Sequence, residues 1–292
     1  MPKALPTVPG LQELKRVTDQ LPRQSRRMPV LFTSHGNPFD IVKSREERPF
    51  WKTLHDLGKS LRAAHDIRAV VVVSAHWITT GVTKVNVSSV QEQLYDYYGF
   101  PAAYYAVEYR AQGSPQVARE VAAALPGVRE SNEWGLDHGA WPMLMHLFPE
   151  ADVPVFQLSI DYHASPRYHY ELGRQLRTLR DRGVLIVGSG SMIHNLRLAM
   201  GKMRTGDHSP FGWEADYDAW LKEQLDHRRV DKLIDYERSH PLGKVASPTP
   251  DHFVPLLYSL GLMDKEDELR YFYDETPDIP AFSERSFLLQ RA

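Results

Sequence analysis

The chain has 292 residues, with 35 basic and 37 acidic side chains, a formal net charge of −2 and no cysteine. The near-balance of charge disfavours binding to nucleic acid or to an anionic membrane surface, because both attract a basic face. The lack of cysteine excludes disulfides, thiolate metal sites and cysteine nucleophiles, so a bound metal would need His, Asp or Glu ligands.

The first 28 residues form a polar segment that mixes Pro, Lys, Arg and Gln around one short amphipathic stretch, Leu11–Leu21. The segment lacks the apolar core of a signal peptide, and no apolar run in the chain is long enough to span a bilayer. We therefore interpret residues 1–28 as an N-terminal arm or cap. We expect a cytoplasmic protein that does not bind membranes.

Four apolar runs predict strands buried on both faces, because they are rich in Val, Ile and Leu and alternate only weakly. They are Pro29–Thr33, Ala69–Ser74, Val153–Ser159 and Val184–Val187. Amphipathic patterns beside them predict helices at Arg48–Ala64, Pro115–Ala124 and Tyr168–Arg182. Val82–Val87 alternates as an edge strand would, and the apolar run in Phe282–Leu289 predicts a last strand.

The alternation of strands and helices predicts the α/β class, with a mostly parallel central sheet flanked by helices. No repeat, low-complexity tract or linker interrupts the pattern, so residues 29–292 are expected to form a single domain. Ligands of open α/β sheets bind at the carboxyl ends of the strands. The active site is therefore expected at the C-terminal edge of the sheet.

Three of the 13 histidines lie just past the carboxyl ends of predicted parallel strands. His35 follows the first strand in Thr-Ser-His-Gly-Asn-Pro, His76 follows the second in Ser-Ala-His-Trp, and His194 follows the fourth after Gly-Ser-Gly-Ser. Because these strand ends meet at one edge of the sheet, the three imidazoles are expected to lie near one another.

Two further histidines stand in settings that favour a site. His252 lies between Pro250 and Pro255, both of which are tolerated if a helix begins there. His138 lies in a Gly-flanked polar turn within an apolar setting. The remaining histidines have no shared context and are interpreted as solvated or hydrogen-bonded side chains: His55, His65, His146, His163, His169, His208, His227 and His240.

Several imidazoles converging on one edge would suit Fe, Zn, Cu or Ni better than Mg or Ca. Their wide spacing in the chain leaves scattered core histidines as an equal alternative.

Gly188–Ile193 lacks the third glycine of a dinucleotide fingerprint and the lysine of a P-loop, so it predicts a tight strand-to-helix turn. No Gly-x-Ser-x-Gly elbow is present, which disfavours an α/β-hydrolase. The aromatic cluster Tyr95–Pro101 could floor a pocket for a flat ring or pack in the core.

From Met28 onward, six ordered blocks of the chain resemble the DOPA 4,5-extradiol dioxygenases, a branch of the class III ring-cleaving dioxygenases related to the protocatechuate 4,5-dioxygenase beta subunit. The blocks are Met28-Pro-Val-Leu-Phe-Thr-Ser-His-Gly-Asn-Pro, Val70-Val-Val-Val-Ser-Ala-His-Trp, Trp134-Gly-Leu-Asp-His-Gly-Ala-Trp, Gln157-Leu-Ser-Ile-Asp, Gly188-Ser-Gly-Ser-Met-Ile-His-Asn-Leu-Arg and Pro248-Thr-Pro-Asp-His-Phe-Val-Pro-Leu-Leu-Tyr.

The resemblance implies metal ligands at His35, His76 and His252; the wider class has a Glu as third ligand, and a His takes that place in this branch. It implies that His194 acts as acid and base or completes a zinc shell, and that His138 is a pocket histidine. Asn37 departs from the Ser of relatives, which should affect the loop and not the ligand.

The activity implied by the resemblance is extradiol cleavage of a small aromatic diol, a DOPA-like or other substituted catechol, with both atoms of O₂ entering a muconic semialdehyde. Fe(II) is the expected cofactor. Zn(II) is expected in purified protein because many-histidine sites bind it more tightly, and zinc has no redox chemistry. A zinc-dependent hydrolase and a non-catalytic metal-binding protein remain the alternatives, and either a monomer or a small homo-oligomer is expected.

Overall fold

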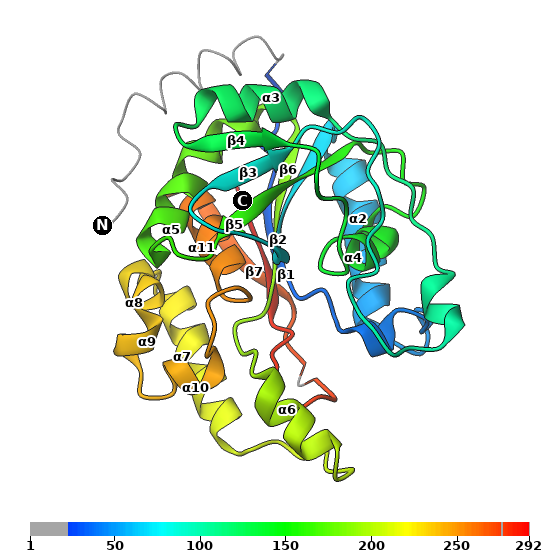
Figure 1. Ribbon diagram of the computed structural model, residues 1–292. Helices are drawn as coiled ribbons and strands as arrows, with labels where there is room; N and C mark the ends of the chain where they lie inside the picture. The colour runs from blue at the N-terminus through cyan, green and yellow to red at the C-terminus, as the bar shows by residue number, and fades with distance from the viewer. Residues whose placement is uncertain (1–22, 276, 292) are drawn as a thin grey trace.

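The computed structural model describes residues 23–275 and 277–291, so the amphipathic stretch Leu11–Leu21 lies outside the described residues. One sheet of eight strands crosses the molecule in the order β4-β3-β5-β2-β6-β1-β8-β7 (Figure 1). The strands are β1 (Val30–Thr33), β2 (Ala69–Thr79), β3 (Thr83–Asn86), β4 (Val128–Ser131), β5 (Val155–Asp161), β6 (Val184–Ser189), β7 (Asp267–Tyr273) and β8 (Ser286–Arg291).

Helices cover both faces of the sheet. They are α2 (Pro49–Ala64), α3 (Pro115–Ala124), α4 (Trp141–Leu147), α5 (Pro166–Gln175), α6 (Leu196–Met203), α7 (Trp213–Asp226), α8 (Val230–Ile234), α9 (Tyr236–Ser239), α10 (Gly243–Ala246) and α11 (Val254–Leu262). Three short 3₁₀ turns complete the elements: η1 (Pro38–Asp40), η2 (Ala102–Tyr105) and η3 (Leu176–Arg182).

The central strands β5, β2, β6 and β1 are parallel, and both flanks of the sheet contain antiparallel pairs. Successive side chains of a strand point to opposite faces. Val71 and Val73 of β2 therefore join one apolar cluster, whereas Val70 and Val72 join another. This is why a strand buried on both faces consists of consecutive valines rather than an alternating pattern.

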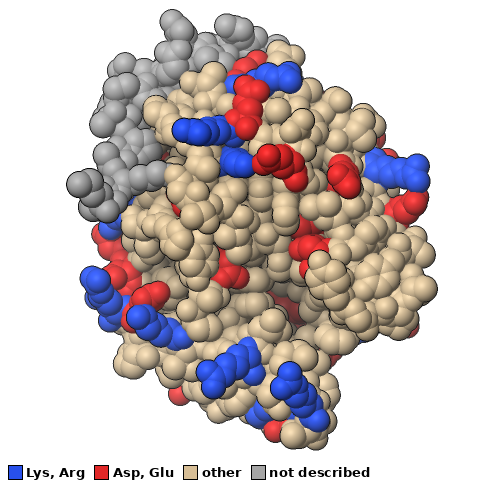
Figure 2. All heavy atoms as spheres, viewed as in Figure 1, with Lys and Arg blue, Asp and Glu red and all other residues tan. Residues whose placement is uncertain are grey.

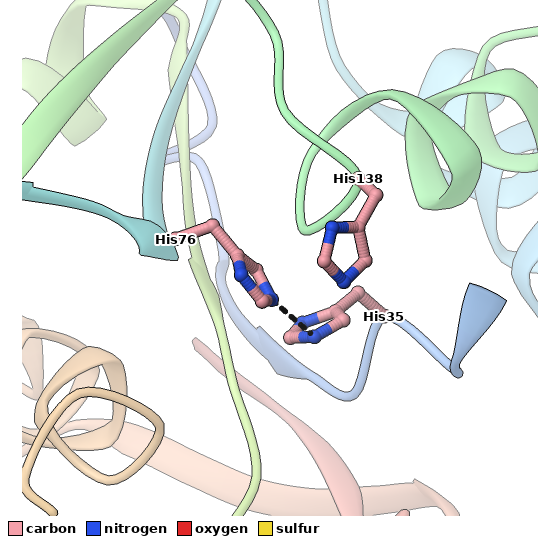
Figure 3. Close-up of side chains that lie close together, drawn as sticks. All are labelled: His35, His76 and His138. Atoms are coloured by element: carbon pink, nitrogen blue, oxygen red, sulfur yellow. Dashed lines mark hydrogen bonds between the residues drawn. The ribbon is translucent and has the colours of Figure 1, made fainter. Parts of the chain in front are cut away.

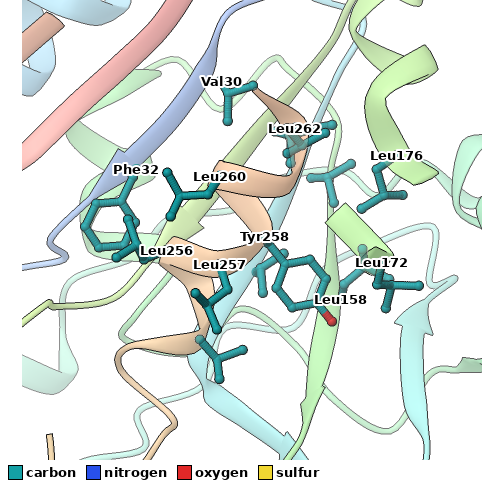
Figure 4. Packing of buried hydrophobic residues seen from close by; sticks show 14 of the residues in the cluster. Val30, Phe32, Leu158, Leu172, Leu176, Leu256, Leu257, Tyr258, Leu260 and Leu262 are labelled. Atoms are coloured by element: carbon teal, nitrogen blue, oxygen red, sulfur yellow. The ribbon is translucent and has the colours of Figure 1, made fainter. Parts of the chain in front are cut away.

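The two clusters pack against different helices. On one face α11 lies over the sheet with α5 beside it, and its residues Leu256–Leu262 contact Phe32 and the α5 side (Figure 4). On the other face α2 packs against α4, with Trp51 and Trp141 among the buried side chains (Figure 1). Every residue of α11 is buried, so the segment directly after His252 is fixed by the core.

The predicted α/β class and mostly parallel central sheet are confirmed, and each of the four predicted buried strands is present. Three details were wrong. Val82–Val87 contains β3, but β3 is not the edge strand that was predicted, because β4 lies beyond it at the edge of the sheet. The strand β7 was not predicted. The helix predicted at Tyr168–Arg182 is instead α5 followed by the 3₁₀ turn η3.

The predicted last strand is present as β8, which pairs antiparallel with both β1 and β7 and so lies inside the sheet. Residues 23–27, the described part of the predicted arm, lead directly into Met28, which is fully buried. None of the described helices has the length and apolar character needed to cross a bilayer.

Candidate metal centre

A row of buried hydroxyls crosses three parallel strands at the C-terminal edge of the sheet. Ser189 of β6 is in register with Thr33 of β1 on one side and with Ser74 of β2 on the other. All three side chains are buried, and each needs a hydrogen-bond partner there. The predicted site begins immediately beyond this row, because His35 follows Thr33 and His76 follows Ser74 by two residues.

His76 lies inside β2, not past its end as the sequence suggested. The strand continues to Thr79, and its register with β5 breaks between Val73 and Ile78. The backbone N–H of His76 donates to Ser74 Oγ at 3.1 Å within this irregular segment. Irregular strand segments of this kind redirect side chains near functional sites, and the break turns His76 toward His35.

His252 reaches the same edge from the loop that precedes α11. A Cβ at Gly190 would lie 2.3 Å from the His252 carbonyl oxygen, so only glycine lets the two backbones approach this closely. The backbone N–H of Ser191 donates to the same carbonyl at 2.9 Å. The Gly-Ser-Gly segment therefore seats His252, and it leads to α6 through the residues that contain His194.

All five candidate histidines meet in one place. The ring centroids of His35, His76 and His252 are 5.0–5.5 Å apart. The ring of His138 is 3.8 Å from that of His76, and the ring of His194 is stacked on His252 at 3.4 Å. Imidazoles bound tetrahedrally about 2.0–2.1 Å from one ion have centroids about 5 Å apart. The first three rings match this spacing.

The rings of His35 and His76 face each other through their Nε2 atoms, which are 3.2 Å apart (Figure 3). Ser189 Oγ donates its single hydrogen to the Gly139 carbonyl. It must therefore accept from His35 Nδ1, 3.0 Å away, which leaves the lone pair of His35 on Nε2. Two ligand atoms of one tetrahedral ion are about 3.3 Å apart, so the observed Nε2 separation suits two ligands.

His35, His76 and His194 are neutral near pH 7. Burial lowers the pKa of His35, His76 and His194 well below the ordinary value of 6.5, and the neighbouring histidines lower it further. A neutral imidazole offers a lone pair to a metal, whereas a protonated one cannot. These three imidazoles are therefore in the protonation state that metal binding requires.

Carboxylates stand behind two of the rings. His252 Nδ1 contacts Asp251 Oδ2, and His138 Nδ1 lies 2.9 Å from Asp96 Oδ2. The second contact is electrostatic, because the ring nitrogen is not aligned for a hydrogen bond. Both carboxylates favour a proton on Nδ1 and so leave Nε2 free, the usual arrangement behind metal-binding histidines.

Two donor groups fit a metal by geometry: His35 with His76 and His138, and His194 with Asp251 and His252, with the atoms in each group within 4.8 Å of one another. The first group contains His138 in the place expected for His252, and His252 belongs to the second group; together the described residues offer five imidazoles and one carboxylate around one cavity. This donor set suits Fe(II) or Zn(II).

The cavity over the histidines has a volume of about 870 Å³, within the range of small-molecule sites. Its wall is largely apolar, formed by Phe39, Tyr98, Phe100, Pro101, Tyr104, Leu196, Met200, Met203, Ile279 and Phe282. The aromatic segment Tyr95–Pro101 thus contributes to the wall, one of the two interpretations that the sequence left open. A flat aromatic ring fits such a wall.

A buried charge cluster anchors the loop that follows His35. The Arg48 side chain pairs with Asp40 at 3.0 Å and also with Glu284, and Asn37 Nδ2 donates to Asp40 Oδ2 at 2.6 Å. Burial raises the pKa of Glu284 to about 7 against the opposing effect of Arg48. Its second oxygen, Oε2, has no hydrogen-bond partner among the described residues.

We expect Glu284→Gln to change how stability depends on pH. A carboxyl whose pKa rises from 4.5 to about 7 on folding destabilises the folded state progressively as pH rises between these values. The glutamine variant has no carboxyl at this position, so it does not lose stability in this way as pH rises. The free energy of unfolding of the variant minus that of the wild type should therefore increase by on the order of 2 kcal/mol between pH 5 and pH 8. Urea unfolding at both pH values measures it, and a constant difference would contradict the pKa shift.

A histidine cluster at the carboxyl edge of the strands of an α/β scaffold is a candidate site for a non-haem metal. Residues 29–282 match the family model described as the catalytic LigB subunit of aromatic ring-opening dioxygenase. The chain belongs to this family of extradiol ring-opening dioxygenases. The resemblance inferred from the six sequence blocks is thereby confirmed.

Similar proteins and a similar solved structure agree with this family assignment. The chain is 38% identical over 251 residues to the 4,5-DOPA dioxygenase extradiol of Escherichia coli (strain K12), covering 84% of this chain and 89% of that protein. It is also 38% identical over 237 residues to the 4,5-DOPA dioxygenase extradiol of Beta vulgaris, covering 80% and 85%. A crystal structure of an uncharacterized protein from Escherichia coli K12 superposes with a TM-score of 0.74 at 34% identity, covering 90% of this chain and 99% of that one.

Sequence reasoning missed three residues that the site uses: Asp96, Ser189 and Asp251. Asp96 and Asp251 follow no spacing rule, although Asp251 directly precedes His252. Ser189 gave a usable signal, because it stands one residue before the glycine that seats His252. Outside the site, the interpretation of His146 as solvated or hydrogen-bonded was wrong: the side chain is buried and stacked on Trp51 with centroids 4.5 Å apart, and neither ring nitrogen has a hydrogen-bond partner among the described residues.

Proposed function

We propose that this protein cleaves a substituted catechol with O₂ in the extradiol manner, with Fe(II) held by His35, His76 and His252. The observation that supports this most is the ring spacing of these three histidines, which suits one ion. The family assignment supports the reaction class, and the names of the relatives support a catechol such as DOPA.

Fe(II) bound in this cavity would supply the centre at which the diol and O₂ react. His194 would take a proton from a catechol hydroxyl and return it later in the reaction. It is suited to this because burial keeps it neutral and ready to accept a proton. Its plane is fixed by stacking on His252 and by the Phe282 ring at 4.5 Å.

His138 would form a hydrogen bond with a substrate or dioxygen oxygen from the opposite side of the cluster. Its backbone N–H donates to Asp96 Oδ1 at 2.8 Å, and the Asp96 carboxylate also faces its ring. A Cβ at Gly139 would lie 2.4 Å from Ser74 Oγ and 2.7 Å from His76 Cδ2, so glycine allows the His138 turn to close over β2. The apolar cavity wall would exclude water from the reacting ring.

Anaerobic loading with Fe(II), followed by a 4-substituted catechol and air-saturated buffer, tests the proposal. Oxygen uptake with a new yellow chromophore supports ring cleavage. Hydrolysis by zinc-loaded protein without oxygen uptake would support the zinc hydrolase instead. Metal binding with neither reaction would support a non-catalytic metal-binding protein.

We expect Asp96→Asn to weaken metal binding. The amide keeps an oxygen for the His138 backbone N–H but removes the negative charge 2.9 Å from His138 Nδ1 and 3.7 Å from His76 Nδ1. Changes of this kind behind ligands typically cost about 10–100-fold in metal affinity. Competition with a chromogenic chelator measures the dissociation constant for Fe(II) or Zn(II). An unchanged constant would show that the Asp96 charge does not act on the cluster.

A further inference from the structure

Some of the described charged side chains that line the cavity contact other side chains, and one does not. Asp96 contacts His138, and Asp251 contacts His252, so both carboxylates have positive or proton-donating partners. Arg197 is the one Lys or Arg among the described residues of the cavity wall. The Arg197 side chain is exposed and, within the described part of the chain, has no hydrogen bond or ion pair. Arg197 is therefore the charged side chain of the described cavity wall that has no partner.

Other cations near the site are neutralised. A smaller cavity beside the first contains Lys43 and Arg48. Lys43 pairs with Asp40 at 2.7 Å, and Arg48 pairs with both Asp40 and Glu284. Neither cation is available to a ligand without breaking a buried pair, which leaves Arg197 as the accessible cation.

Helix stability does not explain the position of Arg197. It stands in the first turn of α6, which begins at Leu196 and has no acidic residue in that turn. A cation near the amino end of a helix interacts unfavourably with the helix dipole. The arginine thus has a small local cost and no partner to offset it, which favours a role toward a ligand.

The distance to the histidines suits one small molecule. Arg197 follows His194 by three residues, which span at most about 11 Å even when fully extended. Both side chains line the same cavity. A single-ring catechol with a short side chain could thus place its hydroxyls at the histidines and its side-chain end at Arg197. Figure 2 shows Lys and Arg side chains gathered over the α6 end of the molecule, beside a hollow.

We propose that Arg197 is a specificity-determining residue that binds an anionic substituent, a carboxylate, on the side chain of the catechol substrate. This inference rests on the proposed ring-cleaving function, whose site it extends. The planar guanidinium matches a carboxylate with two parallel hydrogen bonds, a geometry that neither water nor a neutral amide reproduces.

The test compares two catechols that differ in one charge: 3-(3,4-dihydroxyphenyl)propionate and its neutral carboxamide. Their binding to Fe(II)-loaded protein is measured by anaerobic titration calorimetry, so turnover is not needed. Arg197→Gln should weaken propionate binding about tenfold and carboxamide binding several times less. Equal losses for both ligands, or no loss for the propionate, would overturn the assignment.

Arg204→Gln is the matched control, because Arg204 is exposed, caps the other end of α6 and does not line the cavity. Arg204→Gln changes the net charge of the protein by the same amount as Arg197→Gln. If Arg197 binds the carboxylate directly, Arg204→Gln should leave the preference for the propionate intact. A loss of the preference in this variant would show a general charge effect and overturn the specific role.

The experiment also separates this inference from the proposed function. Wild-type protein that prefers the propionate but consumes no O₂ with it would retain the role of Arg197 and reject ring cleavage. Wild-type protein that cleaves both catechols with equal affinity would retain ring cleavage and reject the role of Arg197. Failure of wild-type protein to bind either ligand would overturn both.

Discussion

Replacing His35 with alanine is expected to abolish both metal binding and ring cleavage. His35 is buried, and its Nε2 lies 3.2 Å from that of His76, with its lone pair fixed by Ser189. Among the described residues, His35 is the one member of the two donor groups that comes from the segment after β1. The loss should exceed the 10–100-fold typical of changes behind a metal ligand, so we expect more than about 100-fold in metal affinity and in turnover.

Metal content after dialysis and oxygen uptake with a catechol measure the two losses separately. His163→Ala is the control, because His163 is exposed and does not line the cavity; it should retain both properties. His194→Ala provides a contrast, since it should lose turnover by about 10²–10⁴-fold as expected for a missing acid–base group while Fe(II) remains bound. Circular dichroism of each variant establishes that it is folded.

Retention of metal and turnover by the His35 variant would remove the proposed metal centre. Loss of metal in the His194 variant would instead make His194 a ligand, the second role that the sequence analysis assigned to it. Unchanged turnover in the His194 variant would remove its role as acid and base.

The central sheet could be predicted from the sequence because its strands are buried on both faces. In β2 the run Ala69–Val73 sends alternate side chains into two different apolar clusters, which requires an unbroken apolar sequence. β4 and β7 could not be predicted in this way. The β4 sequence is only four residues long and half exposed, and β7 has the sequence Asp-Glu-Leu-Arg-Tyr-Phe-Tyr, in which charged residues alternate with partly buried ones at the sheet edge.

The histidines of the candidate site were found because parallel strands bring their carboxyl ends to one edge. That rule places His35 and His194, and it misplaces His76 by putting it beyond a strand that continues past it. It says nothing about Asp96, whose loop reaches the cluster through tertiary contacts with His138 and His76. Contacts of this kind depend on loop geometry, which a single sequence does not specify.

A buried ion pair shows the same limit for stability. The segment Arg177-Thr-Leu-Arg180-Asp-Arg182 has the composition of a solvated surface helix, yet Arg180 is fully buried and pairs with Asp267 through contacts of 2.6 and 2.8 Å. Arg180 also donates to the carbonyl oxygens of Met28 and Leu262 at 2.8 and 3.0 Å. One guanidinium thus connects η3, the start of β7, the end of α11 and Met28, two residues before β1.

Asp267→Asn is therefore expected to destabilise the protein strongly. The substitution keeps the shape of the side chain but leaves the Arg180 charge uncompensated at a site where both partners are 0% exposed. Breaking a buried pair by removing one partner costs about 3–5 kcal/mol, because the remaining charge stays in the core without compensation. Urea unfolding monitored by circular dichroism measures the decrease in the free energy of unfolding.

Asp56→Asn is the matched control, because Asp56 forms an exposed pair with Lys52 on α2. Pairs of this kind contribute about 0.3–0.5 kcal/mol, so the two Asp-to-Asn variants should differ by several-fold in their cost. The double variant Arg180→Met/Asp267→Leu should be more stable than Asp267→Asn, since it removes both charges together. A cost for Asp267→Asn as small as that of Asp56→Asn would show that the core accommodates an unpaired Arg180, by water entry or by movement of the side chain, and that the pair does not hold the four segments together.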